Sequence, residues 1–296
     1  MKTHARMFVM LPVISLALSG MLSSMAIAQS GQPSTPTFKG VIDLDVRKSM
    51  PDWTPYIPKK APEGAPNVLF ILYDDTGLAA WSPYGGRINM PTLDKLAAGG
   101  LTYTQFHTAA LCSPTRSIIQ TGRNHHVNGM ASITEGANGF PGAHGRMPDQ
   151  AATLAEILQD NGYSTFWLGK NHNVAEQDVA SGASRKLWPL QKGFDRFYGF
   201  IGGETNQWYP DLVEDNHFIE PPYSPEQGYH LSKDLADQAI TMIRDQKATN
   251  PSRPWYMWYN PGPTTLPIMR RKNTLPSTRA SSTTVTMRTG RGFLHG

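Results

Sequence analysis

The stretch Asn67-Val-Leu-Phe-Ile-Leu-Tyr73 is a continuous, mostly apolar run that stops abruptly at Asp74-Asp75-Thr76-Gly77. Such a run predicts a β-strand that is buried on both faces in the centre of a parallel sheet. Asp74 and Asp75 would then follow the carboxyl end of this strand, which is where open α/β sheets gather their chemistry.

Predicted helices and strands alternate along the rest of the chain. Helical spacing and start signals indicate helices over 90–98, with Thr92 as N-cap, over 153–160 and 231–246, and a helix start at 117–120. Further strands are expected at 101–106, 163–168 and 254–259. The alternation predicts an α/β domain over residues 65–262, with helices flanking a central, mostly parallel mixed sheet.

Composition narrows the class of protein. The chain has 296 residues, 39% of them hydrophobic, and a formal net charge of only +4, which is typical of a globular protein. Its basic residues form no run before the C-terminal region, so the charge gives no support to nucleic-acid binding. Cys112 is the single cysteine of the chain, so an intrachain disulfide is impossible.

The first 28 residues have the layout of a secretory signal peptide. Lys2 and Arg6 precede a mostly apolar segment over 7–21, and Ala26-Ile27-Ala28 offers a small-x-small cleavage site. The alternative is a membrane anchor, but the apolar segment is short and contains Pro12 and Gly20, so no stable anchor is expected. We therefore expect export by the secretion machinery to the periplasm or medium, with an irregular lead-in over 29–64.

Two short segments contain residues that could bind a metal or take part in catalysis. The adjacent carboxylates of Asp74 and Asp75 suit a hard divalent cation, although a turn or a helix cap would use the same residues. Cys112 lies in Cys112-Ser-Pro-Thr-Arg116, and a free cysteine is usually a small buried hydrophobic residue. Arg116 argues against that reading, because a guanidinium at this spacing can neutralise an anion at the start of a helix.

These motifs together resemble the sulfatase family, closest to its bacterial arylsulfatase branch. The family pattern Cys-x-Pro-x-Arg matches Cys112, Pro114 and Arg116, and it continues in Thr121-Gly122-Arg123. The run 66–75 and the helix at 89–97 match upstream. The segment from Tyr163 to Gly169, with Lys170 and His172, resembles the family's Gly-Tyr-x-Thr-x-x-x-Gly-Lys-x-His motif.

The resemblance implies an alkaline-phosphatase-like sandwich and a set of roles. It implies that a maturation enzyme oxidises Cys112 to formylglycine, the nucleophile toward a small sulfate ester. It also implies that Asp74, Asp75 and the modified Cys112 hold Ca²⁺, with Mg²⁺ as the alternative. Arg116 would stabilise the nucleophile, and Lys170 and His172 would contact the sulfate oxygens.

The resemblance ends near Gly262. The family's His-bearing segment, the distal Asp-Asn pair that completes its metal site and a further Lys do not follow. With suitable codons, the segments 268–273 and 279–286 read His-His-Ala-Pro-Lys-Glu and Lys-Gly-Lys-Phe-Asp-Asp-Gly-Tyr in one neighbouring frame. We therefore interpret 263–296 as a frameshifted tail of a domain that is incomplete at its C-terminus, in a chain with doubtful activity.

Two alternatives to a sulfatase remain open at the sequence level. Sulfate and phosphate are similar tetrahedral anions, so the substrate of the same fold could be a phosphate or phosphonate monoester. The chain could also be a secreted fragment without catalytic activity.

Overall fold

The computed structural model describes residues 37–262, which divide after Ile57 into two compact units. The first unit contains an antiparallel bridge between Val41 and Met50 and the 3-10 helices Val46–Lys48 and Thr54–Tyr56. The predicted signal peptide over 1–28 and the predicted frameshifted tail over 263–296 lie outside the described residues. No helix in the described part is both long and apolar enough to cross a membrane.

The second unit is built on a six-stranded mixed sheet with the order β1-β6-β2-β3-β4-β5. The first four strands in this order run parallel, and β4 and β5 add an antiparallel hairpin at one edge. The strands are β1 (Val68–Ile71), β2 (Ser164–Lys170), β3 (Arg196–Phe200), β4 (Val213–Glu214), β5 (His217–Phe218) and β6 (Trp255–Asn260). The predicted α/β class with a mostly parallel sheet is confirmed.

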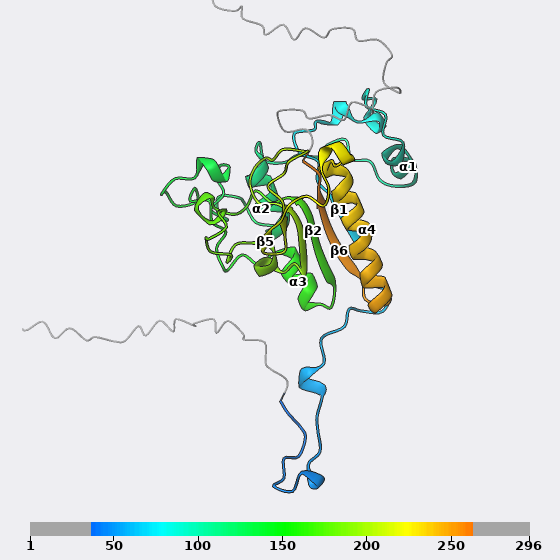
Figure 1. Cartoon of the computed structure of the whole chain (residues 1–296), viewed down its shortest axis with the longest axis vertical. Helices are drawn as coiled ribbons and strands as arrows, with labels where there is room; N and C mark the ends of the chain where they lie inside the picture. The colour runs from blue at the N-terminus through cyan, green and yellow to red at the C-terminus, as the bar shows by residue number, and fades with distance from the viewer. Residues whose placement is uncertain (1–36, 263–296) are drawn as a thin grey trace, which may run out of the picture. The chain divides into compact units, whose positions relative to one another are not determined.

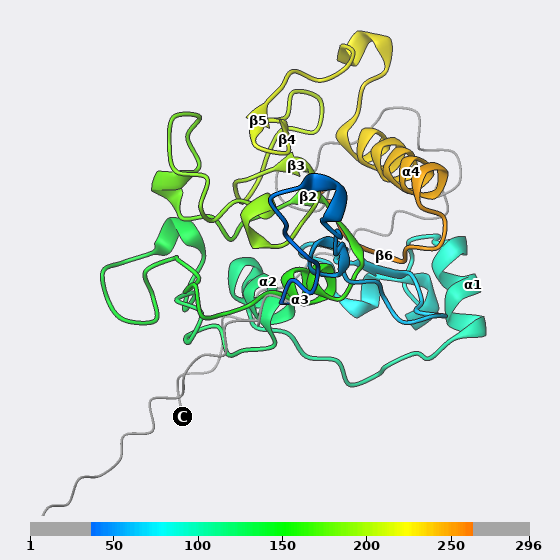
Figure 2. The ribbon, with the colours of Figure 1, turned by 90° about the horizontal axis from the view of Figure 1, so that it is seen from below.

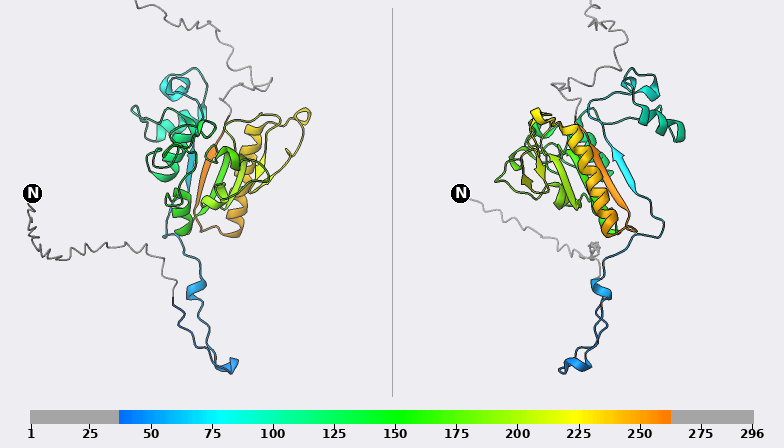
Figure 3. Two further views of the ribbon diagram at one scale, coloured as in Figure 1. Left: turned by 90° about the vertical axis from the view of Figure 1, so that its left-hand side faces the viewer. Right: turned by 45° about the vertical axis from the view of Figure 1, so that its right-hand side comes forward.

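Helices cover both faces of this sheet. They are α2 (Cys112–Thr121), α3 (Leu154–Asp160) and α4 (Leu231–Thr249), whereas α1 (Pro91–Gly99) packs against the 3-10 helix Ser82–Tyr84 and buries none of its residues. Figures 1 and 3 show α4 lying along one face, and Figure 2 shows α2 and α3 on the opposite side.

Alternate residues of each strand supply the two cores, as the period of a β-strand requires. Trp167 and Trp258 point toward α2 and α3, where their rings stack with centroids 4.6 Å apart. Phe166 and Met257 point the other way and pack against Leu235 of α4. The sheet is therefore the middle layer of three.

Local sequence explains how α3 begins and how α2 ends. The Thr153 hydroxyl accepts from the Glu156 backbone N–H, and the Glu156 carboxylate accepts from the Thr153 N–H, which is a capping box. Gly122 ends α2 in the left-handed region, at φ +65°, where a side chain would be strained. Helix α2 begins at Cys112 itself rather than at the predicted 117–120.

Several other sequence predictions are wrong in detail. β1 is an edge strand with alternating exposure rather than a buried central strand, because β6 is its only partner among residues 37–262. Residues 101–106 form no strand and are exposed. Thr92 does not cap α1, which starts at Pro91 after Met90. Strands β3, β4 and β5 were not predicted.

Candidate active site

The parallel strands bring their carboxyl ends to one edge of the sheet, and α2 begins beside that edge. β1 leads directly to Asp74 and Asp75, and β2 ends at Lys170. Cys112 is the first residue of α2, so its side chain sits where unpaired backbone N–H groups favour negative charge. Three segments far apart in sequence thus meet here.

Asp74 is the centre of a buried charge cluster. Its carboxylate lies 2.6 Å from the Lys170 ammonium and 3.4 Å from the Arg116 guanidinium. All three side chains are at most 5% exposed, so little water screens the cluster. Burial lowers the pKa of Arg116, and the neighbouring Asp74 carboxylate opposes that shift.

The backbone carbonyl of Lys170 fixes these groups relative to one another. It accepts hydrogen bonds from Arg116 Nη1 at 3.2 Å, Trp167 Nε1 at 3.2 Å and Asn260 Nδ2 at 3.3 Å. These donors come from α2, β2 and β6, so one oxygen ties the helix to the strand ends. The arrangement holds the Arg116 guanidinium in place before any ligand arrives, while Asp74 holds the Lys170 ammonium.

The loop after β2 is also tied to the start of α2. Asn173 donates to the Ser113 carbonyl at 2.9 Å and accepts from Gln120 Nε2 at 2.7 Å. Both Asn173 and Gln120 are buried. This pair holds the residue next to Cys112 against the loop that carries His172.

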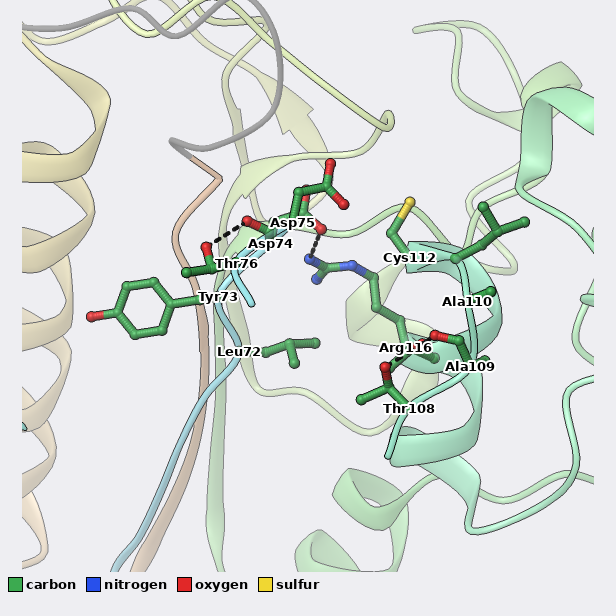
Figure 4. Close-up of a pocket in the computed structure, with 12 residues that line it drawn as sticks. Leu72, Tyr73, Asp74, Asp75, Thr76, Thr108, Ala109, Ala110, Cys112 and Arg116 are labelled. Atoms are coloured by element: carbon green, nitrogen blue, oxygen red, sulfur yellow. Dashed lines mark hydrogen bonds and ion pairs between the residues drawn. The ribbon is translucent and has the colours of Figure 1, made fainter. Parts of the chain in front are cut away.

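A pocket of about 190 Å³ opens between β1 and α2 (Figure 4). Figure 4 shows Asp75 and Cys112 on opposite walls, with the Arg116 guanidinium directed at Asp74. The pocket is lined by residues 72–76, 108–112, Thr115 and Arg116. Cys112 is half-buried and therefore reachable from this space.

His172 contacts Glu135, a residue that the sequence analysis did not single out. Its Nε2 is 2.8 Å from Glu135 Oε2 and 3.0 Å from Oε1, and it is not among the described residues that line the pocket. Burial lowers the pKa of His172, the Lys170 charge lowers it further, and the Glu135 carboxylate opposes both. At neutral pH the imidazole is therefore neutral.

The described residues supply only part of a metal site. Asp74 and Asp75 are hard oxygen donors of the kind that Ca²⁺ and Mg²⁺ prefer. Residues 37–262, however, contain no cluster of three or more His, Cys, Asp or Glu side chains able to hold an ion. Asp74 is also paired with two cations, so the residues as they stand do not form a complete site for a divalent ion.

The structure brings together most of the site residues that the sequence predicts. Asp74, Arg116 and Lys170 are in direct contact, and Asp75 and Cys112 share their pocket. Sequence reasoning missed Glu135, Asn173 and Asn260. Asn260 directly follows the predicted strand 254–259, and this position could have identified it. Glu135 belongs to no motif and follows no strand.

Comparisons with known proteins point to one family. A family model described as Sulfatase matches residues 66–262. An uncharacterized sulfatase of Schizosaccharomyces pombe is 35% identical over 209 residues, covering 64% of this chain and 36% of that protein. The arylsulfatase of Klebsiella aerogenes is 33% identical over 150 residues, covering 50% of this chain and 31% of that protein.

Human steryl-sulfatase is 38% identical over 138 residues, which covers 45% of this chain and 23% of that protein. The chain thus spans about a third or less of these relatives. The crystal structure of Ps i-CgsB in complex with k-i-k-neocarrahexaose superposes with a TM-score of 0.57 at 23% identity, over 70% of this chain and 47% of that one. This last likeness concerns the fold alone.

Proposed function

Because the chain belongs to the sulfatase family, we propose that it carries part of the active site of an enzyme that hydrolyses sulfate esters. The observation that carries this proposal is the position of Cys112, which begins α2 and faces a pocket shared with Asp75 and Arg116. A nucleophile at a helix start beside a buried guanidinium suits attack on an anionic ester.

The charges of the site favour an anionic substrate. Arg116 and Lys170 are two buried cations, and within residues 37–262 Asp74 is the one carboxylate that forms ion pairs with both. We assign Arg116 to stabilising the nucleophile, and Lys170 and His172 to contacting the sulfate oxygens. Fixed cations of this kind stabilise charge that develops on those oxygens.

We propose that a maturation enzyme converts Cys112 to formylglycine, as sulfatases in general require. One hydroxyl of the hydrated aldehyde would attack sulfur and displace the alcohol of the ester. The other hydroxyl would then lose its proton, so that the carbonyl re-forms and sulfate leaves. Mass spectrometry of the Cys112 peptide, after expression with such an enzyme, tests this step. We expect the aldehyde, and a peptide that keeps its thiol would contradict the assignment.

Asp74 and Asp75 would hold one side of a divalent cation, Ca²⁺ or Mg²⁺, whose charge supplies Lewis acidity when it is bound. The modified Cys112 would be a third ligand, and the other ligands would come from residues outside 37–262. We propose that 263–296 is a frameshifted reading of those residues, which would leave this chain with little or no turnover. Sequencing the gene through codons 262–286 tests this. An unbroken frame with the tail codons confirmed would exclude a sequencing error, and codons that do not spell the two motifs in the neighbouring frame would contradict any frameshift.

Export is a further part of the proposal and rests on the segment 1–28. Cleavage after Ala28 would place the mature protein in the periplasm or the medium. N-terminal sequencing of the protein from the expressing cell is expected to begin at Gln29. A mature chain that begins at Met1 would contradict it.

The reaction itself is tested with a frame-restored protein and two substrates, an aryl sulfate and an aryl phosphate. We expect faster hydrolysis of the sulfate, abolished by Cys112→Ala and retained by a surface control such as His217→Ala, which changes an exposed residue of β5. Faster phosphate hydrolysis would favour a phosphate monoesterase. Full activity of Cys112→Ala would remove Cys112 as the nucleophile.

A further inference from the structure

His172 is held in an unusual and well-defined position. It is a non-glycine residue in the left-handed region, at φ +57°, and its side chain is only 4% exposed. Its backbone N–H donates to the Ile201 carbonyl at 3.0 Å, which attaches the loop after β2 to the end of β3. Such strain persists only where surrounding contacts fix the residue, and it is frequent at functional sites.

The two ring nitrogens of His172 have opposite surroundings. Nε2 lies 2.8 and 3.0 Å from the two Glu135 carboxylate oxygens. Nδ1 is buried and has no hydrogen-bond partner among the described residues. An ionised carboxylate only accepts hydrogen bonds, so the nitrogen that faces it must carry a proton. The neutral imidazole is therefore the Nε2–H tautomer, with its lone pair on Nδ1.

The space around the pair is closely fitted. A Cβ added to Gly203 would lie 2.7 Å from His172 Nε2 and 2.7 Å from Glu135 Oε1. Only a glycine leaves room for the carboxylate and the imidazole to meet at this point. The segment that contains Gly203 therefore also leaves space for the Glu135–His172 contact.

We infer that Glu135 is a positioning residue for His172, whose carboxylate holds Nε2–H and so leaves Nδ1 as the nitrogen offered to the substrate. The inference rests on the proposed function, in which His172 contacts the ester. A carboxylate that orients a histidine through its remote nitrogen fixes both the ring plane and the tautomer. The buried, unpartnered Nδ1 becomes a site that awaits a ligand rather than a defect of packing.

Charges around His172 agree with this role. Burial and the Lys170 cation lower its pKa, the Arg116 cation adds to that effect, and Glu135 alone among these groups raises it. The histidine is then neutral in the resting protein and can accept a hydrogen bond or a proton at Nδ1. Glu135 would stabilise the imidazolium whenever that proton arrives.

The test uses the whole chain, labelled with ¹⁵N, and long-range ¹H–¹⁵N correlation spectra of the histidine rings. We expect His172 as the Nε2–H tautomer in the unaltered protein. Glu135→Gln is expected to mix the tautomers and to lower the His172 pKa further. Gly203→Ala, which keeps the charge but intrudes on the contact, should have a similar effect on the tautomer.

Glu176→Gln is the matched control. Glu176 is close enough to Glu135 for their charges to interact, but in the described part of the chain it forms no ion pair with His172. It should leave the His172 signals unchanged. An Nδ1–H tautomer in the unaltered protein, or a Glu135→Gln spectrum identical to it, would overturn the inference even if sulfate esters are hydrolysed.

Kinetics then separate positioning from folding. In the frame-restored protein, Glu135→Gln should lower kcat by about 10- to 100-fold, the usual cost of losing an orienting partner, with little change in KM, and Glu135→Asp should recover part of the loss. An unchanged kcat would contradict the inference. If no ester is hydrolysed while the spectra behave as expected, the proposed function fails and the Glu135–His172 pairing stands.

Discussion

β1 and β2 are both apolar strands that lead into charged residues of the site, yet they differ in burial. Every residue of β2 is buried, whereas β1 alternates, with Leu69 52% and Ile71 38% exposed. β2 lies between β6 and β3 and is covered by α3 and α4, while β1 has β6 on one side only within the described residues. A strand's sequence therefore fixes its conformation, while its neighbours decide its burial.

The largest effect should come from removing the aromatic centre of β2. Trp167 is 1% exposed, stacks on Trp258 and packs against Phe194. Trp167→Ala should destabilise the fold by about 3–5 kcal/mol, because truncation leaves a cavity that the surrounding rings cannot fill. Urea denaturation followed by circular dichroism measures the loss. A change below about 1 kcal/mol would mean that β2 is not the centre of the core.

The charged residue at the end of β2 comes next. Lys170→Met removes the ammonium 2.6 Å from Asp74 and leaves a buried carboxylate with Arg116 at 3.4 Å. Breaking a buried ion pair costs about 3 kcal/mol or more, and we expect a value near 3 because Arg116 remains. Chemical denaturation measures it.

Lys186→Met is the control for Lys170→Met. It breaks a pair with Asp149 in which both side chains are more than half exposed, so its cost should be about 1 kcal/mol or less. Equal losses from the two variants would contradict the idea that burial makes the Asp74 cluster energetically distinct.

The difference between local motifs and long-range contacts explains which parts of the site the sequence could predict. The short-range motifs around Cys112 and at the ends of the two strands identified Asp74, Arg116 and Lys170, because parallel strands bring their carboxyl ends together whatever the sheet order. The edge position of β1 depends on contacts made by residues almost 190 positions away, in β6. Glu135 meets His172 across 37 residues of chain with no periodic pattern between them, so no local signal could predict that pair.

The N-terminal caps of the helices next to β1 and β2 also differ, and changing them should cost less stability than the core and ion-pair variants. α3, which leads into β2, has the Thr153 capping box, whereas α1, which follows β1, starts without a side-chain cap. Thr153→Ala should cost about 1 kcal/mol, and somewhat more if the buried Thr153 hydroxyl bond to the Lys192 carbonyl matters as well. Thr92→Ala, on the predicted but incorrect cap, should change stability by less than about 0.5 kcal/mol. Thermal denaturation of the two variants side by side measures the difference.

The smallest effect is expected on the exposed face of β1. Leu69→Thr keeps a residue that favours β-strands and removes an apolar side chain that is already half exposed, so the stability should change by about 0.5 kcal/mol or less. It should also reduce self-association, because an apolar, unpaired strand edge is a template for pairing with another chain. Denaturation and light scattering measure the two quantities. A loss approaching that of Trp167→Ala would show that β1 is covered in solution by a strand or helix from outside residues 37–262. The difference in burial between β1 and β2 would then hold only within the described residues and not in the whole protein.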